Sequence, residues 1–387
     1  MIALTAATLF TPLERIDHPL LVLEDGVIRE LTTRGDRSLP AGTEFIDLKD
    51  AILVPGYIDL HIHGAAGHDV MEADPDALPD MERLLAHHGV TSYLPTTVTA
   101  PLDDTLTALE RLADAIETAQ KHPPRPGRAR PLGIHLEGPF LSHAKRGVHP
   151  PELLLPPSIE TFERFWQAAR GHISMMTIAP ELPGARELIT VAAHHHVCVS
   201  LGHSDADLAA AHQGVEAGAR HATHTFNAMR ALDHRNPGIL GCVLSDKRVT
   251  ADIIADGIHV HPSMIQLFLQ AKGPNKAVLI TDAISATGMP DGHYRLGRLA
   301  VDVRDGRCES GGVLAGSVLT LDRAVRNIMQ FAEWPLDLAV RMATVNPAKV
   351  LHQEKKIGVI APGAAADLVA VSPSGDVLRT FTGGAAN

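Results

Sequence analysis

Two histidines one residue apart, His61 and His63, follow the hydrophobic run that opens "VPGYIDLHIHGAAGHD", residues 54–69. Side chains at positions i and i+2 of a β-strand point to the same side. Both imidazoles should therefore face the same space at the end of a predicted buried strand. Because imidazole is a good ligand for divalent transition metals, this spacing indicates a metal site.

Polar side chains also follow other predicted strands, namely Glu137 of "HLEGP", His203 of "SLGHSD", His224 of "HATHTFN", His259 of "IADGIHVHP" and Asp282 of "LITDAIS". A single histidine in such a place is more often solvated than a ligand, and a single aspartate more often caps a helix or turn. Histidine or carboxylate residues at six strand ends are hard to explain by six separate coincidences, so they favour one shared site. Imidazole and carboxylate suit Zn²⁺, Fe²⁺, Mn²⁺ or Co²⁺, and the lack of cysteine among these residues argues against a structural cysteine-rich zinc site.

The elements that must position these residues are alternating apolar strands and amphipathic helices, which is typical of βα units around a parallel sheet. Helices are predicted over 101–119, over 158–170 with Ser158 as N-cap, and over 204–217 with Ser204 and Asp207 as a loose capping box. Eight βα units in series predict an α/β fold of the (β/α)8 barrel type, with the chemistry at the C-terminal ends of the strands. The strand candidates span residues 52–60, 90–97, 131–136, 173–179, 197–202, 220–225, 249–255 and 277–281.

Both ends of the chain read differently from its middle. The first fifty residues and the last segment consist of short strands and turns, such as the turn at Asp25-Gly26 between two apolar runs. We therefore expect a small β-domain built from residues 1–53 and 354–387, and a catalytic barrel from residues 54–353. Residues 292–319 are expected to be an insertion of β-hairpin character.

Composition narrows the class of protein. The chain has 387 residues, of which 45% are apolar, and a formal net charge of −11, which argues against a nucleic-acid partner. The sequence contains no run of 18 apolar residues, so we expect no membrane span. We also expect no secretory signal. The three cysteines are odd in number and widely spaced, so we expect a reduced, cytoplasmic protein.

Six motifs together resemble the amidohydrolase superfamily, and more narrowly its N-acetylglucosamine-6-phosphate deacetylases, over about residues 20–371. They are "PGYIDLHIHG", "HLEGPF" followed by "KRGVH", "LGHSDA", "THTFNAM", "ADGIHV" and "TDAISATG". The resemblance implies a TIM-like barrel with a small β-sandwich domain assembled from both chain ends. It also implies hydrolysis of the acetamido group of an amino-sugar phosphate.

The resemblance further implies a set of roles at the strand ends. Glu137, His203 and His224 would hold one divalent metal, Zn²⁺ or Fe²⁺. His61 and His63 would hold a second, giving one or two metals per subunit, with Glu137 bridging. Asp282 would lie nearby as a metal ligand and serve as general base and then general acid.

Substrate contacts carried over from the resemblance lie in loops after the strands, and part of this pocket would come from a neighbouring subunit in a homodimer. Arginine suits the substrate's phosphate because its fork matches phosphate oxygens. The expected substrate-binding residues are His149, Asn227, Ala228, Arg235, His259, Leu314, Ala315 and Gly316.

Two alternatives remain at this point. One is another amidohydrolase, such as a D-aminoacylase, a dihydroorotase or an adenine deaminase, because such enzymes share the paired histidines. The other is a non-catalytic scaffold that keeps the barrel and has lost its chemistry. The pairing of "HLEGPF" with "KRGVH" argues against the first, and the intact set of strand-end residues argues against the second.

Overall fold

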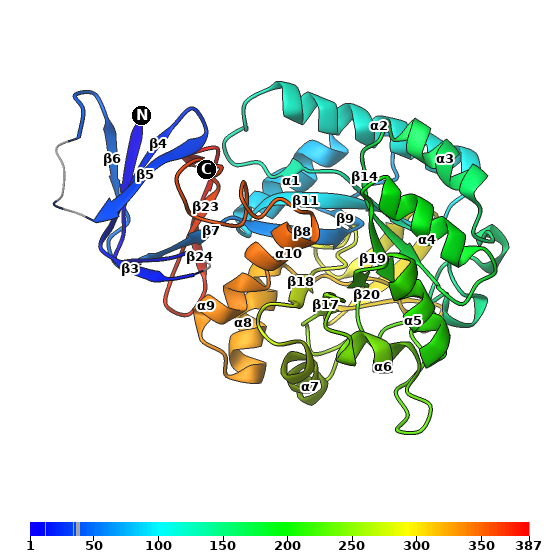
Figure 1. Ribbon diagram of the computed structural model, residues 1–387. Helices are drawn as coiled ribbons and strands as arrows, with labels where there is room; N and C mark the ends of the chain where they lie inside the picture. The colour runs from blue at the N-terminus through cyan, green and yellow to red at the C-terminus, as the bar shows by residue number, and fades with distance from the viewer. Residues whose placement is uncertain (12, 34, 36–38, 387) are drawn as a thin grey trace.

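The computed structural model describes residues 1–11, 13–33, 35 and 39–386. A larger α/β part contains most of the chain, and a smaller part made of strands contains both termini (Figure 1). The two parts are joined through residues around Gly56 and through the segment that follows the last helix.

A curled parallel sheet forms the centre of the larger part. Its seven strands are ordered β12-β11-β13-β14-β15-β16, with β8 paired to the free side of β11, and β17 and β18 form a second parallel pair. These strands are β8 (Tyr57–Ile62), β11 (Val90–Thr97), β12 (Arg130–Pro131), β13 (Ile134–Glu137), β14 (Ile173–Ile178), β15 (Cys198–Leu201), β16 (His221–Ala222), β17 (Ala251–Ile254) and β18 (Ala277–Ile280).

Main-chain hydrogen bonds also join the two parallel sheets at both of their edges. The amide of Thr225 donates to the carbonyl of Asp252 over 2.9 Å, next to β16 and β17. At the other edge the amide of Asp282 donates to the carbonyl of His61 over 2.9 Å. Because the strands run parallel, their carboxyl ends lie on one side of the molecule, which we call the rim.

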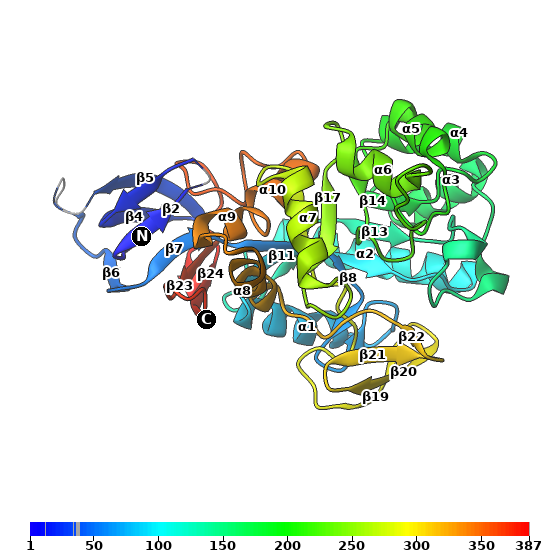
Figure 2. The same ribbon diagram turned by 90° about the horizontal axis from the view of Figure 1, so that it is seen from below.

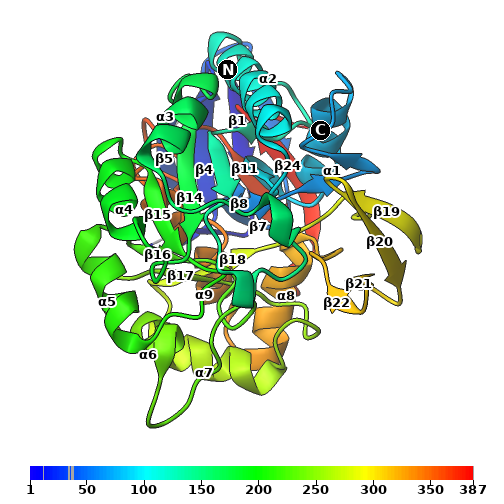
Figure 3. The same ribbon diagram turned by 90° about the vertical axis from the view of Figure 1, so that its right-hand side faces the viewer.

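Helices lie outside the strands and alternate with them along the chain (Figure 3). In the helix predicted over 101–119, Leu109, Leu112 and Ile116 are buried at helical spacing. Ser158 accepts a hydrogen bond from the amide of Thr161 and so caps the next helix as expected. The helices are α1 (Ala77–His87), α2 (Leu102–Lys121), α3 (Ile159–Ala168), α4 (Ala185–His194), α5 (Leu208–Ala217), α6 (Gly238–Ser245), α7 (Pro262–Lys272), α8 (Leu321–Ala332), α9 (Leu336–Arg341) and α10 (Val345–Val350), with 3-10 turns η1 (His143–Lys145) and η2 (Pro151–Leu153).

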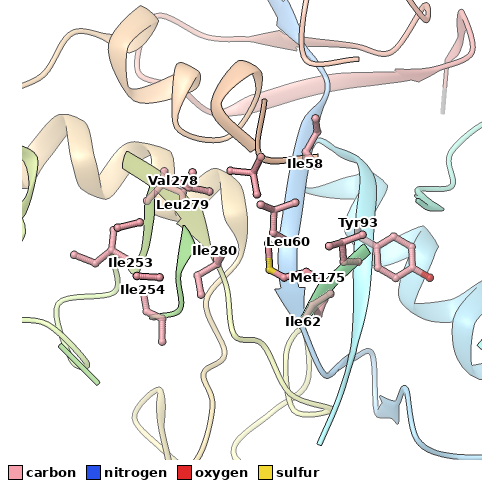
Figure 4. Close-up of a cluster of buried hydrophobic side chains, with 14 of the residues drawn as sticks. Ile58, Leu60, Ile62, Tyr93, Met175, Ile253, Ile254, Val278, Leu279 and Ile280 are labelled. Carbon is pink, nitrogen blue, oxygen red and sulfur yellow. The ribbon is translucent and has the colours of Figure 1, made fainter. Parts of the chain in front are cut away.

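Strand β8 is buried along its whole length, and its two faces differ in chemistry. Ile58, Leu60 and Ile62 belong to the main hydrophobic core, together with residues of neighbouring strands (Figure 4). The alternate residues Asp59 and His61 are fully buried polar side chains. The pleat of this strand therefore places the acidic and imidazole side chains on the face opposite the aliphatic core.

The strand predicted over 52–60 is in fact two strands. β7 (Ile52–Pro55) belongs to a sheet of the smaller part, and β8 to the parallel sheet of the larger part. Between them, a side chain on Gly56 would lie 2.1 Å from the hydroxyl oxygen of Thr91. The chain therefore passes between the two sheets at a residue where only glycine fits.

The smaller part contains two sheets that share a hydrophobic core, formed by side chains such as Leu4, Leu21, Leu53 and Phe381. The predicted turn at Asp25-Gly26 joins β4 to β5, with φ of 52° and 77° at its two residues. One sheet is ordered β5-β4-β1-β6 and the other β25-β24-β23-β7-β2-β3. The strands are β1 (Ile2–Thr5), β2 (Thr8–Phe10), β3 (Arg15–Asp17), β4 (Pro19–Glu24), β5 (Val27–Thr33), β6 (Glu44–Asp47), β23 (Leu368–Val371), β24 (Val377–Thr382) and β25 (Ala385–Ala386).

The insertion predicted at 292–319 is an antiparallel sheet of β19 (Gly292–Leu296), β20 (Leu299–Arg304), β21 (Arg307–Ser310) and β22 (Val313–Leu314). It projects to one side of the molecule (Figure 2). A short pair of strands, β9 (Gly64–Ala65) and β10 (His68–Asp69), follows β8. None of the helices in the described part of the chain combines the length and apolar character needed to cross a membrane.

Two further local predictions are wrong. The helix expected over 204–217 begins only after Asp207, whose side chain accepts a hydrogen bond from the amide of Ala210. Ser204 is not its cap, because its hydroxyl donates to Glu181. The strand expected over 220–225 is limited to His221–Ala222, because the backbone turns at His224, where φ is 31°.

Candidate metal centre

His61 and His63 lie at the end of β8 and point toward the same carboxylate, as predicted. The Nε2 atoms of the two rings are 3.1 Å apart. They lie 3.4 and 3.3 Å from Oδ1 of Asp282, which follows β18. These three side chains therefore form one group that could hold a metal ion.

Glu137, the last residue of β13, lies between this pair and a second pair of histidines. Its Oε1 atom is 3.3 Å from Nε2 of His203 and 3.1 Å from Nε2 of His224, and those two nitrogens are 3.0 Å apart. Its Oε2 atom is 3.2 Å from Nε2 of His63. The carboxylate is thus within reach of both pairs.

The backbone orients two of these rings. Nδ1 of His63 lies 3.0 Å from the carbonyl oxygen of Thr96, and Nδ1 of His203 lies 2.9 Å from that of Lys145. A carbonyl can only accept, so each Nδ1 carries a proton, and each Nε2 is the atom that faces the carboxylates and is available to a metal. This arrangement of a protonated distal nitrogen and a free proximal one is the one that metal-binding histidines adopt.

Both rim carboxyl groups are held ionised. Burial raises the pKa of Glu137, but His61 and the surrounding imidazoles outweigh it and hold this pKa well below its usual range. Burial likewise raises the pKa of Asp282, yet His61 and His63 lower it to about 2. The two negative charges are therefore available to a cation.

The histidines respond to the same two charges. Burial lowers the pKa of His63, but the carboxylates of Asp282 and Glu137 outweigh it and raise the value to about 10. Against the same burial, Glu137 raises the pKa of His224 to about 9. Burial dominates at His203 and lowers its pKa to about 4. The two carboxylates thus make the rim attractive to positive charge.

The donor set fits a divalent cation. Four imidazole nitrogens and two carboxylates converge, with the distances above lying between 3.0 and 3.4 Å. Ligands bound at about 2.1 Å to one ion are separated by roughly 3.0–3.5 Å in tetrahedral or octahedral geometry. Five of the six side chains are more than nine-tenths buried, and that of Asp282 is 13% exposed. These residues could therefore bind one metal ion, or two that share Glu137.

His149 lies beside Glu137 at the edge of this centre. Its Nε2 atom is 3.6 Å from Oε2 of Glu137, and its Nδ1 atom is 2.8 Å from the hydroxyl oxygen of Thr99. With Glu137 and His203 it forms a second group of possible metal donors. His149 therefore borders both the donor cluster and the space above it.

The other expected substrate-binding residues lie in loops that follow the strands, where each has local contacts. Asn227 donates to the carbonyl of His224 over 3.3 Å, and Ala228 follows with φ of 50°. Arg235 lies in an exposed loop, and its amide donates to the carboxylate of Asp233. His259 pairs instead with Asp256, at 2.7 Å between Nδ1 and Oδ2.

The segment 314–316 lies next to the main chain of Asp282. Leu314 ends β22, and Ala315 is buried. Gly316 has φ of 62°, and a side chain there would lie 2.9 Å from the carbonyl oxygen of Asp282. The amide of the next residue, Ser317, donates to that carbonyl over 2.8 Å. The insertion is thus connected to the backbone of a rim carboxylate.

A buried polar layer below the rim was not predicted. Asp59 accepts hydrogen bonds from the amide of His61 and the hydroxyl of Thr281, so it holds the ends of β8 and β18 together. His135 stacks edge-on against His61, with ring centroids 4.6 Å apart. The signal for both was present in "DLH" and "HLE", where each residue precedes a rim residue by two positions and so shares its face.

The loop that carries His203 is fastened by Glu181, which follows β14. Its carboxylate accepts the hydroxyl of Ser204 over 2.7 Å and the amide of Asp205 over 2.6 Å. The two carboxylate oxygens of Asp205 in turn accept hydrogen bonds from Nε and Nη2 of Arg230, over 3.2 and 3.1 Å. The loops after β14, β15 and β16 are therefore tied to one another beside the donor cluster.

Comparison with known proteins agrees with this geometry. The family model described as the amidohydrolase family matches residues 52–386. The N-acetylglucosamine-6-phosphate deacetylase of Vibrio furnissii is 38% identical over 95% of this chain and 90% of its own length. The N-acetylgalactosamine-6-phosphate deacetylase of Escherichia coli O157:H7 is also 38% identical, over 95% of this chain and 94% of its own.

Solved structures give the same result. A mutant of the N-acetyl-D-glucosamine-6-phosphate deacetylase of Mycobacterium smegmatis, in complex with N-acetyl-D-glucosamine-6-phosphate, superposes with a TM-score of 0.92. It is 34% identical and the match covers all of this chain and 98% of that one. Amidohydrolases are in general divalent-metal dependent, in accord with the donor groups at the rim. The chain belongs to the amidohydrolase family.

Proposed function

We propose that this protein hydrolyses the acetamido group of N-acetylglucosamine 6-phosphate to glucosamine 6-phosphate and acetate. The observation that carries the proposal is the convergence of four imidazole Nε2 atoms and two ionised carboxylates at the rim. The names of relatives that match almost the whole chain supply the substrate.

Glu137, His203 and His224 are proposed to hold one divalent metal, and His61 and His63 a second that shares Glu137. We expect Zn²⁺ or Fe²⁺, with one or two ions per subunit. When bound, such a metal lowers the pKa of water and polarises a carbonyl oxygen. The carbonyl-bound Nδ1 of His203 supports this assignment, since it leaves Nε2 as the ligand atom.

Asp282 is proposed as the general base and then the general acid. Its carboxylate is ionised, so an oxygen of the group can take the proton of the attacking water and return it to the leaving amine. Amide hydrolysis needs this second transfer because an unprotonated amine is a poor leaving group. His149, which is anchored by Thr99 beside Glu137, is proposed to orient the acetamido carbonyl.

The sugar and its phosphate are proposed to lie above the rim. Asn227 and Ala228, Arg235, His259 and the segment Leu314–Gly316 would contact them. The exposed position of Arg235 and the lack of an ion-pair partner for it among the described residues support a role for its guanidinium in phosphate binding. We further propose a homodimer in the cytoplasm, and the three unpaired cysteines of the described chain support a reducing compartment.

We also propose that the parallel strands close into a (β/α)8 barrel, formed by residues 54–353. The hydrogen bonds that join both edges of the curled sheet to β17 and to the segment after β18 support closure. Residues 1–53 and 354–387 are proposed to form a β-sandwich domain, supported by the core that its two sheets share.

One observation favours a second substrate. The Escherichia coli relative named for the galactosamine epimer is as similar to this chain as the glucosamine relative from Vibrio furnissii. Because the two sugars differ at a single hydroxyl, the acetamido chemistry would be the same for both. The choice between them then depends on residues above the rim rather than on the metal donors.

Acetate release tests the proposal. The purified protein is assayed with N-acetylglucosamine 6-phosphate, its galactosamine epimer, the unphosphorylated sugar and an N-acetylated D-amino acid, and metal content is measured on the same sample. We expect turnover of a phosphorylated sugar well above that of the unphosphorylated one. Turnover of the amino acid alone, or of none of the four by a metal-loaded sample, would overturn the proposal.

A further inference from the structure

A cluster of metal-ligating side chains lies outside the rim, between helices α5 and α6. It contains His212 of α5, Cys242 of α6 and Asp246, the residue that ends α6. Nδ1 of His212 is 3.6 Å from Sγ of Cys242 and 3.9 Å from Oδ2 of Asp246. We refer to these three residues as the α5–α6 cluster.

The helical repeat explains how the cluster forms. Cys242 and Asp246 are four residues apart, so their side chains lie on the same face of α6. That face packs against α5, which contributes His212. The Cys242 side chain is fully buried, whereas 43% of the His212 side chain is exposed. The cluster is therefore built into the helix interface and reaches solvent through the imidazole.

The separations match those of a tetrahedral zinc site. Zinc binds thiolate sulfur at about 2.3 Å and imidazole nitrogen at about 2.0–2.1 Å, which places the two ligand atoms roughly 3.6 Å apart. The same geometry places nitrogen and carboxylate oxygen roughly 3.4 Å apart, somewhat less than the 3.9 Å seen between His212 and Asp246. Because Arg248 holds the carboxylate of Asp246, the half-exposed His212 side chain would have to shift toward it when a metal binds.

Two cations lie beside the cluster and shape its affinity. Arg248 binds the Asp246 carboxylate, with Nη2 2.7 Å from Oδ2. Nζ of Lys272 donates to the main-chain carbonyls of Val243 and Asp246. A carboxylate has lone pairs for both a metal and a guanidinium. Burial raises the pKa of the Cys242 thiol to about 11, and the positive neighbours reduce the attraction for a cation, so we expect micromolar binding.

We propose that His212, Cys242 and Asp246 form a separate site for a thiophilic divalent cation such as Zn²⁺, with water as the fourth ligand. The site would fasten α5 to α6. The chain between these helices includes β16, His224 and the loop with Asn227 and Arg235. A metal at the α5–α6 cluster would thus restrain the segment that enters the rim, by closing a loop of about 30 residues.

Cobalt spectroscopy tests the site without reference to catalysis. The full-length chain is stripped with a chelator and titrated with Co²⁺. A cobalt–thiolate bond gives a charge-transfer band in the near ultraviolet, and the rim cannot produce one because its donors include no sulfur. We expect the band in the unaltered chain, its loss in Cys242→Ser, and its displacement by added Zn²⁺. Cys308→Ser is the matched control and should keep the band.

A second variant protects the test from a folding failure. His212→Ala removes a half-exposed side chain, and it should raise the Co²⁺ concentration needed for the cobalt–thiolate band at least tenfold while the far-ultraviolet circular dichroism of the fold stays unchanged. Absence of the band in the unaltered chain, or its persistence in Cys242→Ser, would overturn the proposal. Because the readout is a cobalt–sulfur band, failure here leaves the proposed deacetylase activity unaffected.

Discussion

Buried histidines occur in two layers inside the curled sheet, and the layers differ in how their charges are matched. In the lower layer Nδ1 of His221 lies 2.7 Å from the hydroxyl of Thr250, and Nε2 lies 2.9 Å from a carboxylate oxygen of Asp252. That imidazole has one carboxylate and a partner for each nitrogen. At the rim, four imidazoles share Glu137 and Asp282, and their Nε2 atoms face each other in pairs.

The comparison shows what distinguishes a structural histidine from a candidate ligand. Burial and a nearby carboxylate are common to both layers, so neither decides. At the rim, Nε2 of His61 lies 3.1 Å from Nε2 of His63, and Nε2 of His203 lies 3.0 Å from Nε2 of His224. A cation could be shared by such a pair of nitrogens, whereas the lower histidine has a partner for each nitrogen without one.

Removing the shared carboxylate is expected to have the largest effect. Glu137→Gln keeps the shape of the side chain and deletes the charge that both histidine pairs share. We expect loss of bound metal and a fall in kcat/KM of about 10³-fold or more, since a catalytic metal is worth several kcal/mol. Elemental analysis and acetate release measure both effects.

The control for that variant is Glu163→Gln, at a surface carboxylate that also pairs with a histidine, His195. It should keep both metal and activity. Chelation of the unaltered protein should reproduce the Glu137→Gln defect and be reversed by metal. A fully active, metal-free Glu137→Gln protein would mean that the rim is no different from the lower layer.

Asp282→Asn separates proton transfer from metal binding. The amide cannot take a proton from water, so kcat should fall by about 10²–10⁴-fold while Glu137, His203 and His224 keep their metal. Steady-state kinetics and metal content on one preparation measure the two effects. Full activity with metal bound would show that Asp282 is not the base.

Asp252→Asn should affect stability more than metal binding, although Asp252 also accepts a hydrogen bond from the amide of His224 at the rim. The substitution removes the carboxylate that lies 2.9 Å from Nε2 of the buried His221, and leaving a buried hydrogen-bonding group without its partner costs about 1–3 kcal/mol. Urea denaturation of the metal-free protein measures the loss. Asp302→Asn makes the same change in an exposed pair with His293 and should cost less than about 1 kcal/mol. Equal losses would contradict the contrast between layers.

Glu181→Ala should have the smallest effect of the four. It frees the loop of His203 by removing the acceptor for Ser204 and for the amide of Asp205. Loss of a group that orients a ligand typically weakens metal affinity about 10–100-fold. Competition with a chromogenic chelator measures this, and Glu187→Ala on the exposed face of α4 is the control. Unchanged affinity would show that the loop needs no fastening.

Much of this architecture could be predicted from local pattern. The two-residue spacing of His61 and His63 correctly placed both rings on one face, because a strand's pleat is a local property. The passage between two sheets at Gly56 could not be predicted, because it depends on contact with Thr91, far away in sequence. Nor could the role of Ser204, whose partner Glu181 lies after a different strand.

Position at a strand end predicted which residues share the rim but not how each is used. His259 has the same kind of position as His224, yet its ring pairs with Asp256 within its own loop. Asp252 and His221 lie mid-sheet, where a polar residue in one sequence gives no sign of its partner. Such pairs depend on the register between neighbouring strands, which a single sequence does not specify.

The carbonyl groups that orient His63 and His203 belong to the main chain of Thr96 and Lys145. Every residue type has such a group, so no single replacement of a side chain can delete either acceptor. The direction of these two rings is thereby insulated from point mutation. The half-buried side chain at position 145 can therefore change in evolution while the carbonyl of that residue still orients the imidazole of His203.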